Sequence, residues 1–221
     1  MKLKRRTIGF IFGVLVTLGV VLAASLLVGR EYPSRQTARR SFVIDHDFTD
    51  VRKILVRNNA TKQIVTMGGD SEYIDDDMES VGLESGRPLD QLLNPDWQLH
   101  VNGTLRVRTK DEYVGQHTIA LAQDIEITSD YLHSQTHLKE PSGRLKEYDM
   151  KTHFDRAPET GKAKVTLELT QMILTDAPWF AHGIADRRVK ASAERTLANQ
   201  EEAIRKLIED NIDDVPLFPL R

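Results

Sequence analysis

The stretch TLELTQMILTDAPWFAHGIADRRV, residues 166–189, changes its hydrophobic period at Asp176. Before Asp176 apolar residues mostly alternate with polar ones, and after it they recur every three or four positions. The first period is that of a strand with one buried face, and the second is that of an amphipathic helix. Asp176 suits the cap of this helix and Pro178 its first turn. We therefore predict a strand that passes almost directly into a long C-terminal helix.

The predicted helix extends from Pro178 to Asn211 and would measure about 50 Å without a break, so we expect an interruption near Gly183. Glu201 and Arg205 are spaced for a favourable i, i+4 ion pair on the exposed side. The apolar stripe consists of Ala185, Val189, Ala193, Leu197, Ile204, Leu207 and Ile208.

Upstream, alternating segments predict an antiparallel sheet with one buried and one exposed face. The first strand is expected at residues 41–48. A helix follows from Val51, is divided at Asn58-Asn59 and ends at Gly68-Gly69. Further strands are expected around Ile119, Leu121, Ile125 and Ile127, in LKEYDMKTHF (residues 145–154), and from Val165 onward.

Residues 97–107 have apolar side chains of one parity on both sides of Asn102-Gly103. A two-residue hairpin at Asn-Gly would mix the two faces, whereas one strand bent or bulged at Gly103 keeps them apart. We favour the bent strand.

The segment 70–96 contains nine acidic residues against Arg87 alone. It lacks the Asp-x-Asp-x-Asp-Gly pattern that wraps a calcium ion. We interpret its Asp75-Asp76-Asp77 run as part of a solvated acidic loop.

Residues 7–29 carry no charge and follow a basic stretch, Lys2 to Arg6. As a helix they span about 35 Å, enough for a hydrocarbon core of about 30 Å. A cleaved signal peptide, ending near Ala23-Ala24-Ser25, is the alternative. The preceding basic residues favour an anchor with its N-terminus inside and the domain on the extracytoplasmic side.

These observations predict four segments: a basic stub and transmembrane anchor at 1–29, a linker at 30–40, one domain at 41–212, and an apolar tail at 213–221.

The formal net charge is −3, from 30 basic and 33 acidic residues, which gives no electrostatic footprint for nucleic acid. Cysteine is absent, which excludes cysteine-based zinc sites and thiol nucleophiles. His133 and His137 are four apart, but in a β-like run such residues lie about 13 Å apart. We predict neither a metal site nor a cofactor.

The order of strand, helices, antiparallel strands and one long helix resembles the START-related helix-grip superfamily, SRPBCC. The residues that carry the resemblance are VIDHDFTDVRKIL, residues 43–55, and ILTDAPWFAHGIADRRVKASAERTLANQEEAIRKLIED, residues 173–210. The resemblance implies an α+β fold in which a curved antiparallel sheet wraps around a long C-terminal helix. Most members bind lipids, sterols, polyketides or other apolar molecules between sheet and helix, and some are enzymes.

If a cavity lies between sheet and helix, its walls come from inward-facing residues. Gln123 interrupts an apolar face and is a candidate to bond a polar group of the ligand. The full set of candidates is Leu121, Gln123, Ile125, His133, Tyr148, Met150, Phe154 and Trp179.

Three hypotheses of function follow. The first is a membrane-tethered domain that binds or transfers a hydrophobic small molecule or lipid. The second is a protein-interaction or scaffold domain with a filled core, in which Trp97, Tyr148, Met150 and Phe154 meet. The third is a cyclase- or hydrolase-like enzyme with an acid–base pair in the cavity, for instance His133 with a carboxylate.

Overall fold

A computed structural model describes residues 16–20, 30–57, 60–81, 98–110 and 115–214 of the chain. Of the predicted anchor, residues 16–20 are helical and the remainder lies outside the described residues, as do Trp97 and residues 215–221 of the predicted tail. Within the described ranges, no helix combines the length and apolar character needed to cross a membrane.

The described strands form one antiparallel sheet of seven strands, in the order β1-β7-β6-β5-β4-β3-β2. Consecutive strands from β2 to β7 are neighbours, and the first strand pairs with the last. The strands are β1 (Arg30–Asp47), β2 (Ser71–Val81), β3 (Leu99–Thr109), β4 (Thr118–Ile127), β5 (Tyr131–Leu138), β6 (Leu145–Arg156) and β7 (Lys162–Ala177).

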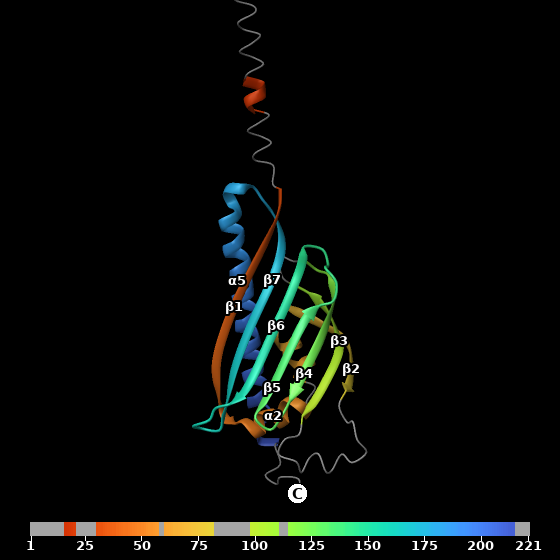
Figure 1. Cartoon of the computed structure of the whole chain (residues 1–221), viewed down its shortest axis with the longest axis vertical. Coiled ribbons are helices and arrows are strands. Elements are labelled where there is room, and N and C mark those ends of the chain that lie inside the picture. Colours follow the sequence, from red (N-terminus) through yellow and green to blue (C-terminus); the bar gives the residue numbers. More distant parts are fainter. Residues whose placement is uncertain (1–15, 21–29, 58–59, 82–97, 111–114, 215–221) are drawn as a thin grey trace, which may run out of the picture.

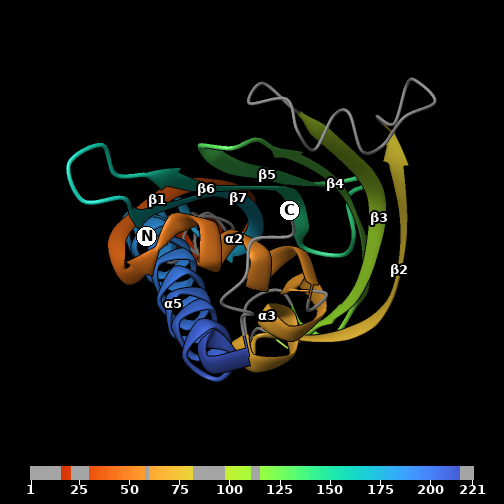
Figure 2. The same ribbon diagram turned by 90° about the horizontal axis from the view of Figure 1, so that it is seen from below.

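The helices lie on the concave side of this curled sheet (Figure 2). The chain crosses from the β1 edge to the β2 edge through α2 (Phe48–Arg57) and α3 (Ala60–Gly68), and the long α5 (His182–Glu209) lies alongside β1 and β7 (Figure 1). Short 3-10 turns, η1 (Trp179–Ala181) and η2 (Ile212–Asp214), flank α5. The predicted α+β architecture of a curved antiparallel sheet around a C-terminal helix is confirmed.

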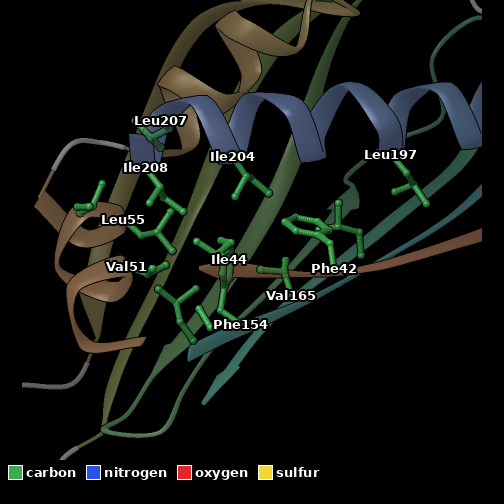
Figure 3. Packing of buried hydrophobic residues seen from close by; sticks show 14 of the residues in the cluster. Phe42, Ile44, Val51, Leu55, Phe154, Val165, Leu197, Ile204, Leu207 and Ile208 are labelled. Carbon is green, nitrogen blue, oxygen red and sulfur yellow. The ribbon is translucent and has the colours of Figure 1, made fainter. Parts of the chain in front are cut away.

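The main core lies where α2 and the second half of α5 meet β1, β6 and β7 (Figure 3). The predicted stripe of α5 is buried along its whole length, from Ala185 to Ile208. It packs against inward residues of the sheet such as Phe42, Phe154 and Val165. Burial of these side chains contributes about 25 cal/mol for each Å² of apolar surface removed from water.

The expected linker at residues 30–40 is wrong, because these residues form the first half of β1. They pair with β7 from Arg30 opposite Ala177 to Arg40 opposite Leu167. Pro33 suggested a break, but β1 is an edge strand, and an edge strand tolerates a residue without an N–H on its open side.

The expected acidic loop at residues 75–77 is also wrong, because these residues lie in β2. β2 pairs with β3, which carries the opposite charge, and Arg106 Nε lies 2.6 Å from Asp75 Oδ1. Glu72 lies 3.7 Å from Arg108 and 3.8 Å from Lys110. Charged side chains are also typical of edge strands, where they oppose edge-to-edge aggregation.

The prediction of a single strand through Gly103 is confirmed, but β3 has no bulge there and its register with both neighbours is continuous at this residue. A Cβ at Gly103 would lie 2.5 Å from the backbone oxygen of Asp77 and 2.8 Å from the Cα of Met78. Glycine is therefore required by the close approach of β2.

The helix start differs from expectation in its cap. β7 continues to Ala177, so Asp176 is a strand residue that pairs with Arg144 instead of capping a helix. The predicted interruption near Gly183 takes the form of η1, after which α5 begins at His182 without a side-chain cap. At the first helix, by contrast, Asp47 accepts a hydrogen bond from the Thr49 N–H at 2.8 Å, which is typical of an N-cap.

Candidate functional site

A cavity of about 300 Å³ lies between the concave face of the sheet, α3 and α5. Its size is at the lower end of the range of small-molecule sites. A core filled by its own side chains leaves no space of this kind, so the hypothesis of a filled core does not describe this part of the molecule.

Most of the cavity wall is apolar. The sheet contributes inward side chains of β2 to β6, because alternate residues of each strand face the helices. Helices α2, α3 and α5 line the opposite side. The apolar lining consists of Met78, Leu105, Val107, Leu121, Ile125, Ile127, Leu132, Met150 and Phe154 from the sheet, with Leu55, Val56, Ala60, Ile64, Val65 and Ile204 from the helices.

One polar group of the lining is centred on Gln123 of β4, which is 7% exposed. Its amide nitrogen donates to Ser134 Oγ at 3.1 Å, and its amide oxygen accepts from the Thr61 hydroxyl at 3.4 Å. Thr136 and Thr152 line the same cavity from β5 and β6. The hydroxyl and amide groups here are able to bond a polar part of a ligand.

A second polar group joins three distant parts of the chain. Asp70, just after α3, accepts a hydrogen bond at Oδ1 from Asn199 Nδ2 of α5 at 3.0 Å. Tyr148 of β6 lines the cavity with these two residues. Burial raises the pKa of Tyr148 to about 12, and the negative charge of Asp70 adds to the shift. The Tyr148 phenol therefore stays protonated at neutral pH.

No protein-family model matches the chain, and no curated protein matches it. Solved structures do. A protein of unknown function from Staphylococcus aureus is 8% identical, with 82% of this chain and 98% of that chain covered and a TM-score of 0.53.

The curved seven-stranded sheet around the long C-terminal helix is the helix-grip fold.

Two further structural neighbours are the Zhui aromatase/cyclase from Streptomyces sp. R1128 (10% identity, 80% and 96% covered, TM-score 0.48) and a START superfamily protein from Mycobacterium smegmatis (11% identity, 79% and 97% covered, TM-score 0.45). At such identities the likeness concerns the fold alone, and function has to be argued from the site.

The helix-grip cavity contains six of the eight residues singled out from the sequence. These are Leu121, Gln123, Ile125, Tyr148, Met150 and Phe154. That they contact a ligand stays a prediction.

His133 does not line the helix-grip cavity. Leu132, Ser134 and Thr136 of β5 face inward, so His133 projects from the opposite face of the sheet. There its Nε2 lies 2.8 Å from Asp155 Oδ1, and its ring lies 4.2 Å from the ring of His153. The proposed pairing of His133 with a carboxylate is therefore present, but outside the cavity.

Trp179 also lies away from the cavity. It belongs to η1, is 66% exposed, and contacts Phe180 edge-to-face with ring centroids 5.9 Å apart. Phe180 and Ile184 are exposed beside it, at 56% and 49%. We call Trp179, Phe180 and Ile184 the apolar tip of the domain.

Sequence reasoning missed Asp70, Asn199 and Thr61 as lining residues. Asp70 was grouped with the acidic segment, although its position directly after Gly68-Gly69 places it at the end of a helix next to the sheet. For metals, the described ranges hold no group of three His, Cys, Asp or Glu side chains arranged to bind an ion.

Proposed function

We propose that this domain binds a small, largely apolar molecule in the cavity between the sheet, α3 and α5. The observation that carries the proposal is the cavity itself, about 300 Å³ with a mainly apolar wall and two polar groups. An apolar ligand there would replace water against hydrocarbon, and the polar groups would fix its orientation.

We further propose that residues 7–29 hold the domain at a membrane, on the extracytoplasmic side. The uncharged segment and the preceding basic residues support this placement. β1 begins at Arg30, immediately after the segment, so the tethered domain would be attached at the start of its edge strand.

An enzymatic role of the cavity has less support than a binding role. The pair proposed from the sequence, His133 with a carboxylate, lies on the outer face with Asp155. We therefore propose binding as the activity of the cavity, and transfer of the ligand as its extension.

The test is native mass spectrometry of the full chain, extracted from the host membrane, compared with a variant whose cavity is filled. Thr136 faces the cavity, so Thr136→Phe should occupy part of it. Gln135, the preceding residue, is exposed on the opposite face, so Gln135→Phe is the matched control.

We expect a stoichiometric extra mass with the wild type and with Gln135→Phe, and its loss with Thr136→Phe. Membrane lipids that adhere elsewhere would be retained by all three proteins. An extra mass that persists in Thr136→Phe, or no extra mass in any protein even after addition of a mixed lipid extract, would contradict the proposal.

A further inference from the structure

One oxygen of Asp70 is buried without a hydrogen-bond partner. Oδ1 is held by Asn199 at 3.0 Å, and the backbone oxygen of Asp70 accepts from the Lys110 N–H at 2.8 Å. Oδ2 is buried as well, but no described residue donates to it. The carboxylate is thus fixed in position with one acceptor unused.

Such an acceptor is unusual, because buried polar atoms nearly always have a partner. Leaving a buried acceptor unpaired is unfavourable, and more so when the group is charged. The arrangement indicates that Oδ2 receives its hydrogen bond from something other than the described chain.

The residues around Asp70 indicate which kind of ligand group donates the hydrogen bond to its Oδ2. The described lining of the cavity contains no Lys, Arg or His side chain, and Asp70 is its only carboxylate. The Tyr148 hydroxyl makes no hydrogen bond to a described residue, although it lies close enough to Asp70 for its pKa to respond to the charge. This end of the cavity therefore offers a negative acceptor and a neutral phenol.

We propose that the ligand carries a hydrogen-bond donor, a hydroxyl or a protonated amine, that Asp70 accepts, and that the cavity rejects carboxylic acids of the same shape. An ionised acid would bring a second negative charge next to Asp70 in a site with no described cation to compensate it. A hydroxyl would in addition accept a hydrogen bond from Tyr148. This inference rests on the proposed binding function and names the chemical class of its ligand.

The volume of the cavity limits the size of a probe ligand. At about 30 Å³ for each water-sized group, 300 Å³ holds about ten such groups. We choose three probes of nearly equal shape that stay within this size: 4-methylbenzyl alcohol, 4-methylbenzylamine and 4-methylbenzoic acid. They differ mainly in the polar end.

The experiment measures binding of each probe at pH 7 to the full chain in lipid nanodiscs. The Thr136→Phe protein in identical nanodiscs gives the background from partition into lipid. We expect the alcohol, the amine or both to bind the wild type at least tenfold more tightly than the acid. In Asp70→Asn, which keeps the shape and removes the charge, the disadvantage of the acid should fall to less than threefold.

Each outcome decides something. Binding of the alcohol alone identifies a hydroxyl ligand, and binding of the amine alone identifies a cationic one. If the acid binds the wild type as tightly as the others, the role of Asp70 is overturned while the binding function stands. If no probe binds above background, the binding function fails together with the inference. If Asp70→Asn does not fold, as judged by circular dichroism, the wild-type ratio decides alone.

Discussion

The hydroxyl of Ser34 on β1 donates a hydrogen bond of 2.6 Å to Asp186 Oδ1 in the second turn of α5. Ser34 is fully buried, and Tyr32, two residues earlier, donates to the same carboxylate and stacks on His182 with ring centroids 3.7 Å apart. The start of the long helix, which lacks a side-chain cap, is thus fastened to the edge strand.

Asp186→Ala should therefore destabilise the domain. It leaves the buried Ser34 hydroxyl without its acceptor, at a cost of about 1–3 kcal/mol. Asp186→Asn keeps an acceptor oxygen in place and should cost less than half as much. Chemical denaturation of both variants checks this, and equal losses for Ala and Asn would contradict it.

Substitution by alanine should change the stability of the domain in opposite directions at Gly103 and at Gly183. Gly103→Ala places a Cβ 2.5 Å from a backbone oxygen, which must shift, at a cost of about 1–3 kcal/mol. Gly183 lies in the first turn of α5 with open space around it, so Gly183→Ala should stabilise by about 0.5–1 kcal/mol through helix propensity. The midpoint of thermal unfolding should fall in Gly103→Ala and rise in Gly183→Ala. An unchanged midpoint in Gly103→Ala would show that the β2 backbone shifts to accept the new Cβ without loss of stability.

Much of the fold could be predicted because its signals are local. Tyr148, Met150 and Phe154 share one parity in β6, and that parity faces the helices. β2 was missed because its acidic side chains meet basic residues of β3, such as Asp75 with Arg106, and this compensation of charge lies in another segment of the chain. The pairing itself leaves no hydrophobic period in residues 71–81.

The polar part of the site was harder to predict for a related reason. Asp70 and Asn199 are 129 positions apart, and only the packing of α5 brings them together. On β5 the inward side chains include Ser134 and Thr136, so hydrophobicity did not mark the inner face and His133 was assigned to the wrong side.

Stability should depend on pH through Glu201. Burial alone raises the pKa of this carboxyl, but hydrogen bonds from Arg40 and Arg205 outweigh it and hold the pKa below its usual value. A lowered folded pKa gives stability that is present above the unfolded pKa of about 4.3 and is lost as the pH falls through the folded pKa.

The free energy of unfolding of Glu201→Gln should therefore lie about 1 kcal/mol below that of the wild type at pH 7. The gap should close as the pH falls below about 4. Denaturant titrations of both proteins at pH 7 and at a pH below about 4 measure this gap. A gap that is constant with pH would mean that packing, and not ionisation, accounts for the loss.

The apolar tip predicts contact with lipid in the tethered protein that we propose. Arg30 pairs with Ala177, and Trp179 follows two residues later, so Trp179 lies next to the point where the uncharged segment joins β1. Aromatic side chains prefer the membrane interface. The chain has two tryptophans, so Trp97→Phe makes Trp179 the single reporter.

In proteoliposomes, the fluorescence of Trp179 should be quenched strongly by brominated lipids and weakly by iodide in solution. A single tryptophan placed at Val43, an exposed residue near the far end of β1, is the control and should respond to iodide instead. Equal quenching of both positions by iodide would rule out contact between the apolar tip and the bilayer.

In the tethered protein that we propose, the register of β1 also relates the cavity to the bilayer surface. Across the sheet, Tyr148 is level with Gln36 and Phe154 with Phe42, which are six and twelve positions beyond Arg30. At about 3.3 Å for each residue, the cavity of the tethered domain lies about 20–40 Å along β1 from the bilayer surface. If β1 stands upright on the bilayer in the proposed tethered protein, a small ligand in the cavity is out of reach of the membrane. It would then arrive and depart through water or by way of a second protein that meets the domain at that height.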